Sequence, residues 1–192
     1  MPWTGVGARV TPLLIQKVMT LFASTMETLC RHGFAEGADQ AFGKGAQKQE
    51  IYLPWRGFNG HKTGMWDYTE AQIMFAEYLA WKVYPVVIPD NFMKLFRRNA
   101  FQIVGLSTCV EDVKPSSFVM CWTPDGCIGR QTYNYGTTGG TGVAILIAEE
   151  FEVPVYNLAR PEHMRMVLSH LNDHGIKTVK LEKDLRKQGL FA

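Results

Sequence analysis

A glycine-rich turn between a buried strand and an apolar helix is the feature that most constrains the fold. Residues 117–122, Ser-Phe-Val-Met-Cys-Trp, form a continuous apolar run, which is typical of a strand covered on both faces of a parallel sheet. Further along, the turn leads directly into an almost wholly apolar segment at 141–151. Glycines allow a ligand to approach the backbone closely, and a helix N-terminus attracts anions. The pattern predicts a phosphate site built from Thr138, Gly139, Gly140, Thr141 and Gly142.

Short apolar runs alternate with amphipathic segments along the rest of the chain. Strands are expected at 2–6, 50–54, 117–122, 153–156 and 176–181. Helices are expected at 10–32, 37–47, 69–83, 90–106, 141–151 and 161–174. Helices that alternate with strands in this way indicate an α/β fold with a mostly parallel sheet. The length of 192 residues favours one domain, which we place at 1–181, followed by a charged tail at 182–192.

Composition excludes several classes of protein. Hydrophobic residues make up 46% of the chain and the net charge is +2, so nothing suggests a general nucleic-acid binder with a dominant basic face. No run of 18 apolar residues predicts a membrane span. The first nine residues lack the pattern of a signal peptide, which favours a cytoplasmic location.

The cysteines favour reduced thiols over a zinc site. No Cys-x-x-Cys pair occurs among Cys30, Cys109, Cys121 and Cys127. We therefore expect no metal and no cofactor. Two phosphate-binding motifs are also missing at the glycine turn. No lysine follows Gly142, as a P-loop requires, and Ile145 stands where a dinucleotide fingerprint needs its third glycine.

Several polar residues follow predicted strands or begin predicted helices. Arg9 comes just after the opening strand and its glycines, Gly5 and Gly7, where a phosphate contact is natural. Asp39 follows Gly37-Ala38 at a helix start, so it either binds a ribose hydroxyl, polarises a water, or only complements the helix dipole. Thr123 and Asp125 end the buried strand at the expected crevice, where turn chemistry predicts the same residue types.

Two further segments offer ligand contacts. Arg98 and Asn99 lie on a predicted helix with apolar neighbours, where they reach the ligand or merely solvate one face. Trp55 lies in a long loop at 55–68, in which aromatic and cationic residues are interleaved. Such a loop either stacks a base or folds over the core by its own aromatics. We favour a contact between Trp55 and a base.

Several motifs together resemble the SLOG superfamily, which joins the DNA-processing protein A group and the Lonely Guy phosphoribohydrolases. The matching stretches are Thr4-Gly-Val-Gly-Ala-Arg9, Glu36-Gly-Ala-Asp-Gln-Ala-Phe42, Trp122-Thr-Pro-Asp-Gly126 and Val153-Pro-Val-Tyr-Asn-Leu158, together with the glycine turn. The branch that they resemble most is a group of bacteriophage proteins described as DNA recombination-mediator protein A. The resemblance implies a Rossmann-like three-layer sandwich, a nucleotide-derived ligand and a homo-oligomer.

The chain departs from this family at the position that carries catalysis. The phosphoribohydrolases have a glutamate where this sequence has Leu146, and Val143 replaces their threonine. We therefore expect a protein that binds a nucleotide, and a phage source would make it a sequestering agent for a signal nucleotide in the host cytoplasm. One alternative is an N-glycosidase of nucleoside 5′-monophosphates with Asp39 as the acid group. The other is a single-stranded DNA-binding recombination mediator.

A second departure lies between the first helix and Gly37. The family carries a strand that ends in Ser-Gly-Gly-Ala there, whereas Arg31-His-Gly-Phe34 runs directly into Ala35. A helix that extends to His32 would leave no strand beside the opening one. We therefore expect several residues to be absent near Phe34–Ala35.

Overall fold

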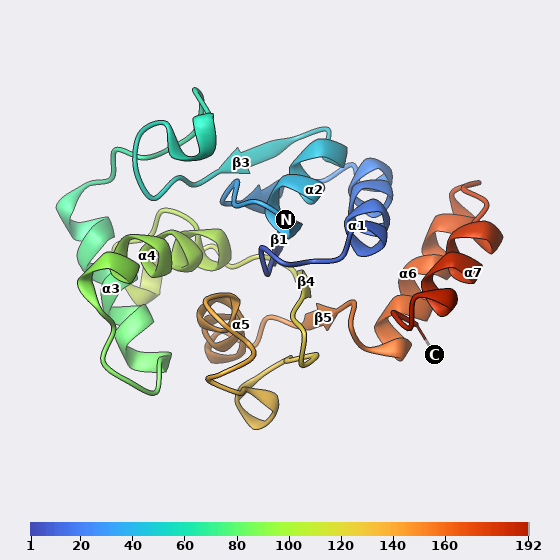
Figure 1. Cartoon of the computed structure of the whole chain (residues 1–192). Helices are drawn as coiled ribbons and strands as arrows, with labels where there is room; N and C mark the ends of the chain where they lie inside the picture. Colours follow the sequence, from blue (N-terminus) through green and yellow to red (C-terminus); the bar gives the residue numbers. More distant parts are fainter. Residues whose placement is uncertain (192) are drawn as a thin grey trace.

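A parallel sheet forms the centre of the molecule in the computed structural model, which describes residues 1–191 (Figure 1). Over these residues the sheet has five strands in the order β3-β2-β1-β4-β5. They are β1 (Trp3–Gly7), β2 (Cys30–His32), β3 (Gln49–Ile51), β4 (Val119–Trp122) and β5 (Val155–Asn157), and every pair of neighbours is parallel. The expected α/β fold, a Rossmann-like three-layer sandwich, is confirmed.

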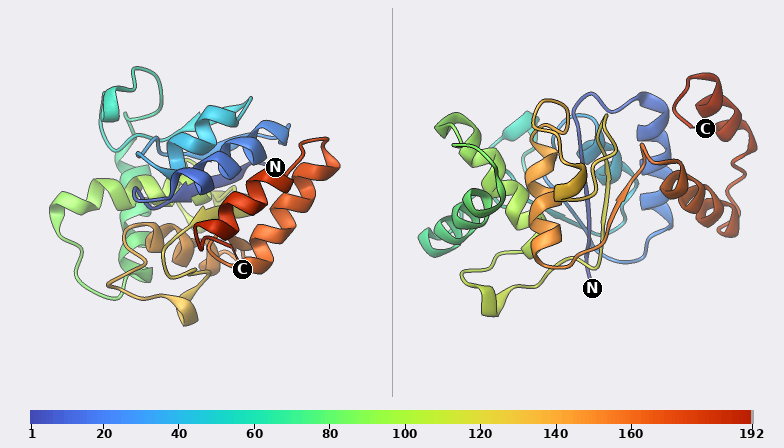
Figure 2. Two further views of the ribbon diagram at one scale, coloured as in Figure 1. Left: turned by 45° about the vertical axis from the view of Figure 1, so that its right-hand side comes forward. Right: turned by 90° about the horizontal axis from the view of Figure 1, so that it is seen from below.

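Helices cover both faces of the sheet, as the view from below in Figure 2 shows. One face carries α1 (Leu13–Thr25), α2 (Ala38–Gly45), α6 (Pro161–Asp173) and α7 (Val179–Lys187). The other carries α3 (Glu70–Val83), α4 (Asp90–Val104) and α5 (Thr141–Glu150). Because side chains alternate along a strand, Trp3 and Met120 face the first group of helices, whereas Val6 and Cys121 face the second.

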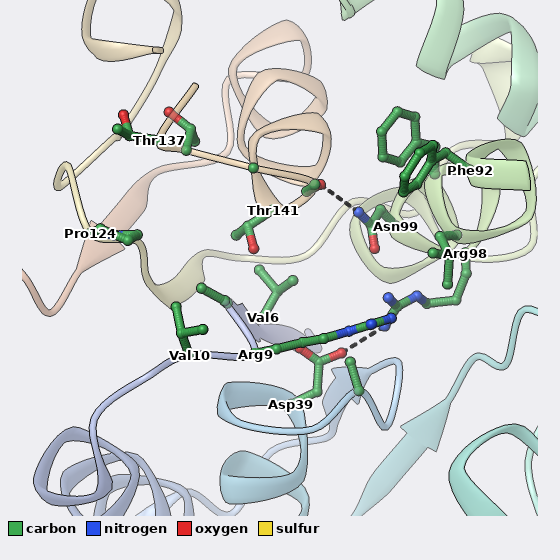
Figure 3. Close-up of a pocket in the computed structure, with 18 residues that line it drawn as sticks. Val6, Arg9, Val10, Asp39, Phe92, Arg98, Asn99, Pro124, Thr137 and Thr141 are labelled. Carbon is green, nitrogen blue, oxygen red and sulfur yellow. Dashed lines mark hydrogen bonds and ion pairs between the residues drawn. The ribbon is translucent and has the colours of Figure 1, made fainter. Parts of the chain in front are cut away.

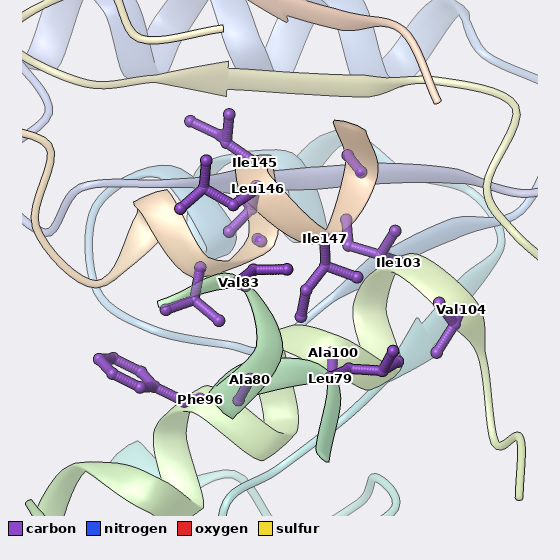
Figure 4. Packing of buried hydrophobic residues seen from close by; sticks show 14 of the residues in the cluster. Leu79, Ala80, Val83, Phe96, Ala100, Ile103, Val104, Ile145, Leu146 and Ile147 are labelled. Atoms are coloured by element: carbon purple, nitrogen blue, oxygen red, sulfur yellow. The ribbon is translucent and has the colours of Figure 1, made fainter. Parts of the chain in front are cut away.

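Helix α5 is buried along nearly its whole length. Residues 141–148 are all buried, and the helix packs against α3 and α4 in one apolar cluster that includes Leu79, Ile103 and Ile147 (Figure 4). A helix that is apolar all round is one that must be buried. This packing holds the N-terminus of α5 in a fixed position near the carboxyl end of β4.

The predicted first helix and the predicted gap in the sheet are both wrong. Helix α1 ends at Thr25, whose hydroxyl donates to the Phe22 carbonyl at 2.7 Å, and Met26 is already extended. Strand β2 then pairs with β1 on one side and β3 on the other. The sheet therefore has its strand beside β1, and the reason for expecting absent residues near Phe34–Ala35 disappears.

The predicted strand at 176–181 is also wrong. Residues from Val179 onward form helix α7, which continues through most of the segment that was expected to be a charged tail. Leu181, Leu185 and Phe191 are buried against α1 and α6. Helix α7 is therefore amphipathic. Its apolar residues pack on the neighbouring helices, and the charged residues between them lie on its outer side.

The other predicted helices and strands are confirmed within a few residues at each end. Thr69 caps helix α3, and its hydroxyl accepts from the Gln72 N–H. Within residues 1–191, no helix has the length and apolar character needed to cross a bilayer.

Candidate functional site

A cavity of about 330 Å³ lies beyond the carboxyl ends of β1 and β4 (Figure 3). These two strands lie at the point where the strand order reverses, since β1 leads to α1 on one face and β4 leads to α5 on the other. Ligands of open α/β sheets bind at such switch points. The cavity is lined by residues 6–10, the β2–α2 connection, one side of α4 and residues 137–141.

The glycine turn forms one wall of this cavity. Gly139 has φ +67°, a left-handed conformation that favours glycine, and Gly140 immediately precedes α5. Within the part of the chain that the structure describes, the N–H groups of Gly140 and Thr141 donate to no protein acceptor. Figure 3 shows the Thr141 side chain pointing into the cavity. The wall therefore offers free donors at the positive end of a buried helix.

Two arginines converge on the cavity from different elements. Arg98 of α4 is almost fully buried and its Nη1 lies 2.8 Å from Asp39 Oδ2, while Arg9 follows β1 and extends toward the Arg98 guanidinium (Figure 3). Burial lowers the pKa of Arg98, the ion pair with Asp39 opposes this shift, and the charge of Arg9 adds to it. Among residues 1–191, Arg9 has no hydrogen-bond or ion-pair partner. One positive charge in the cavity is thus left unbalanced.

Asp39 is the carboxylate that partners Arg98. It is 1% exposed, and its Oδ2 accepts from the Gly33 N–H at 2.9 Å and from Gln102 Nε2 at 3.4 Å as well as from Arg98. Its Oδ1 is buried without a hydrogen-bond partner in the described structure. One oxygen of Asp39 therefore accepts from three protein donors, and within residues 1–191 the other is buried with none.

Asn99 connects α4 to the glycine turn. Its Nδ2 donates to the Gly140 carbonyl at 2.8 Å. Its Oδ1 is buried and, within residues 1–191, has no partner, and Figure 3 shows it turned toward the cavity. Asn99 therefore fixes the turn through its nitrogen and offers an acceptor through its oxygen.

The glycines near β1 serve mainly to bring α2 close to the sheet. A Cβ on Gly5 would lie 2.5 Å from Phe42 Cγ, and one on Gly7 would lie 2.6 Å from Ala38 Cβ. Gly37 has φ +82°, and its Cβ would lie 2.6 Å from the Ala8 carbonyl oxygen. Gly7 lines the cavity, whereas Gly5, Gly37 and Ala38 do not. These contacts position Asp39 beneath the cavity.

Thr123 and Asp125 shape the loops and lie behind the cavity wall. Thr123 Oγ1 accepts from Asn157 Nδ2 at 2.7 Å, while Asp125 Oδ2 accepts from the hydroxyls of Thr137 and Thr138. Partial burial acts to raise the pKa of Asp125, but hydrogen bonds from Thr138, Thr123 and Thr137 outweigh it and lower the pKa. An ionised Asp125 therefore holds the segment that leads into the glycine turn. Gly142 lies one residue beyond the cavity lining and leaves room for Tyr133.

Trp55, which was expected to contact a base, lies outside the cavity, and two other aromatic residues line it. Trp55 is 44% exposed, packs edge-on against Phe58 and does not line the cavity. Phe92 and Phe96 of α4 do line it; both lie in the expected helix 90–106, but neither was predicted to contact a ligand. Phe92, Phe96 and Asn99 are spaced at i, i+4 and i+7, which places all three on one side of α4. This spacing is the feature of the sequence from which their shared position could have been predicted.

The β2–α2 connection begins at a buried histidine. His32 Nε2 lies 2.9 Å from Gln49 Oε1, and its Nδ1 accepts from the Phe34 N–H at 3.3 Å. The neutral ring therefore satisfies both partners. Burial lowers the pKa of His32 below its ordinary value of 6.5, and the bond to Gln49 opposes this shift. The pKa values of His163 and His170 are lowered as well, first by burial.

We expect the free energy of unfolding to fall as the pH decreases below about 6.5. The unfolded chain then binds protons that the folded chain takes up only at lower pH. Urea unfolding at pH 7 and at pH 5 measures the loss, and His32→Gln should make it smaller because one of the three contributing histidines is gone. An equal loss in the variant and the wild type would exclude His32 as a contributor.

Comparisons with protein-family models, with curated proteins and with solved structures found no match. Over the described residues, no group of three His, Cys, Asp or Glu side chains is arranged to hold a metal ion. The geometry of the cavity therefore carries the functional argument.

Proposed function

We propose that the cavity binds the phosphate group of a nucleotide-type ligand between the glycine turn and the two arginines. The observation that carries this proposal is Arg9, an unpaired cation that extends toward a second, buried guanidinium. Like charges held together repel, so an anion between them would be stabilised by both. The free N–H groups at the start of α5 would contribute further donors. Arginine and backbone donors together are a common arrangement for phosphate.

A flat apolar surface beside the arginines favours a nucleotide over a bare phosphate. Phe92 is 46% exposed and stacks on Phe96, with ring centroids 6.2 Å apart and ring planes inclined by 26°. Its free face is available to an aromatic base, and bases stack on aromatic side chains without strict sequence preference. Phe92 therefore takes the role in base binding that we had expected of Trp55.

The arrangement supports binding more than hydrolysis. Leu146, at the position of the family's catalytic glutamate, is fully buried in the core beneath the cavity. Glu149 and Glu150 lie away from the cavity and bond to Arg130 and Lys82. Among the described residues, Asp39 is the sole carboxylate that lines the cavity, and one of its oxygens is committed to Arg98. Within residues 1–191, the cavity therefore offers no carboxylate that is free of an arginine partner to protonate a leaving base.

We expect Arg9→Gln to weaken the binding of nucleoside 5′-monophosphates by about tenfold or more, because a charge-assisted bond to phosphate is lost. Arg9 is exposed and holds no protein group, so the fold should be unaffected. Isothermal titration calorimetry measures the affinity, with Arg56→Gln as a matched control outside the cavity. Equal affinities for the wild type and Arg9→Gln would remove Arg9 from the site.

A further inference from the structure

The loop at 55–68 does not line the cavity, yet it contacts one of the two arginines that do. Resting on the proposed function, we infer that this loop positions the Arg98 guanidinium for the phosphate. Phe58 is the loop residue in contact with the arginine, and Trp55 and Asn59 support that contact. The three act through Arg98 and its surroundings and do not touch the ligand themselves.

The contact between the loop and the site is a cation–π pair. Phe58 is 4% exposed, and the guanidinium carbon of Arg98 lies over its ring at 6.0 Å from the centroid. The face of an aromatic ring is its negative side, so it attracts a cation, more strongly where water is excluded. Arg98 Nε is buried and has no hydrogen-bond partner within residues 1–191. The ring therefore stabilises a cation that is withdrawn from water.

Two contacts from the chain that follows β2 hold the same guanidinium. It packs directly on the backbone of Gly33, where a Cβ would lie 1.7 Å from Arg98 Nη1. Asp39 Oδ2 accepts from that Nη1 at 2.8 Å and from the Gly33 N–H at 2.9 Å. Phe58 is thus the restraint on the guanidinium that the loop supplies.

Trp55 supports Phe58 from within the loop. It packs edge-on against the Phe58 ring, with centroids 5.0 Å apart and ring planes inclined by 89°, which is a favourable arrangement of two aromatic side chains. A tryptophan that lies outside the cavity therefore bears on the phosphate site, because it restricts the ring on which Arg98 rests.

The same loop holds a strained residue of the β2–α2 connection. Phe34 has φ +55°, a left-handed conformation that is unfavourable for a bulky side chain. Its carbonyl accepts from Asn59 Nδ2 at 3.1 Å, and its ring packs on His61 with centroids 4.0 Å apart. Backbone strain persists where surrounding contacts fix it. Phe34 lies between Gly33 and the cavity residue Ala35, so the loop also fixes the backbone on which the guanidinium packs.

Phe58→Leu tests this inference, because it keeps an apolar side chain and removes the aromatic face. We expect its affinity for nucleoside 5′-monophosphates to fall by about threefold to thirtyfold, the range of a buried cation–π contact. Trp55→Leu should give a smaller loss in the same direction. Phe58→Tyr keeps the ring face and should bind as the wild type does. Isothermal titration calorimetry measures the affinities, and circular dichroism confirms that each variant is folded.

A matched control separates positioning from a general loss of stability. Phe75→Leu makes the same change at a buried position that does not line the cavity, and it should leave the affinity unchanged. Equal affinities for Phe58→Leu and the wild type would overturn the inference and leave the phosphate site standing. An equal loss in Phe75→Leu, or in folded Phe58→Tyr, would also overturn it. Absence of monophosphate binding by the wild type would contradict the proposed function, and the inference that rests on it would fail as well.

Discussion

Replacing Asp39 by alanine is expected to lower the free energy of unfolding by about 3–5 kcal/mol, the usual effect of breaking a buried ion pair. Arg98 would be left almost fully buried without its counter-charge, and the Gly33 N–H would lose its acceptor. Few surface substitutions approach this magnitude. Urea unfolding monitored by circular dichroism measures the change.

Two comparisons identify the cause of this loss. Glu36→Ala removes an exposed carboxylate three residues away and should change stability by less than about 0.5 kcal/mol. The double variant Asp39→Ala/Arg98→Met removes both charges and should recover part of the loss, since the uncompensated cation is gone. If Asp39→Ala were as stable as Glu36→Ala, the ion pair between Asp39 and Arg98 would not stabilise the folded protein, contrary to this account.

Gly140→Asp is expected to abolish nucleotide binding, with a loss of affinity of about a hundredfold or more. The new carboxylate would lie at the start of α5, where it would accept from the free N–H groups and repel the phosphate. The backbone tolerates the change, because Gly140 has φ −63° and its Cβ would meet just one atom, Phe96 Cε1 at 3.4 Å. Aspartate at a helix start is itself stabilising.

Calorimetry of the variant, with thermal unfolding alongside, checks this expectation. Gly140→Ala is the matched control, because it adds a Cβ without a charge and should retain most of the affinity. A folded Gly140→Asp protein that binds nucleotide as tightly as the wild type would place the phosphate elsewhere.

The wall of the cavity that the glycine turn forms could be predicted from local sequence. An apolar run, a glycine turn and an apolar helix follow one another at 117–151, and this order is typical of a strand, a turn and a helix at the carboxyl end of a parallel sheet. Arg9 and Asp39 could be predicted on the same grounds, since they follow strands or begin a helix at the edge where such ligands bind. These arguments need no knowledge of distant parts of the chain.

Strand β2 could not be predicted in this way, because its polar residues are satisfied by distant partners. Arg31 is buried and bonds to Glu50 and to the Lys114 carbonyl, while His32 bonds to Gln49. A short segment with two such residues shows no apolar run or alternation, and it resembles the end of the preceding helix. Tertiary contacts therefore decide its conformation.

The apolar side of the site was missed for a related reason. Phe92 lies on α4, which belongs to the long connection from β3 at one sheet edge to β4 beside β1. Helical spacing indicates that Phe92 and Phe96 share a side of α4, but the direction of that side depends on how the connection packs. The contacts of α4 with α3 and α5 set this direction.

Calorimetric titration with a nucleoside 5′-monophosphate and with the same nucleoside lacking phosphate tests the phosphate site most directly. If Arg9, Arg98 and the start of α5 hold the phosphate, the monophosphate binds and the nucleoside binds at least about a hundredfold more weakly. Raising the salt concentration should weaken binding of the monophosphate, because charge drives it. Equal affinity for the two compounds, or no binding of any of the common monophosphates, would contradict the account.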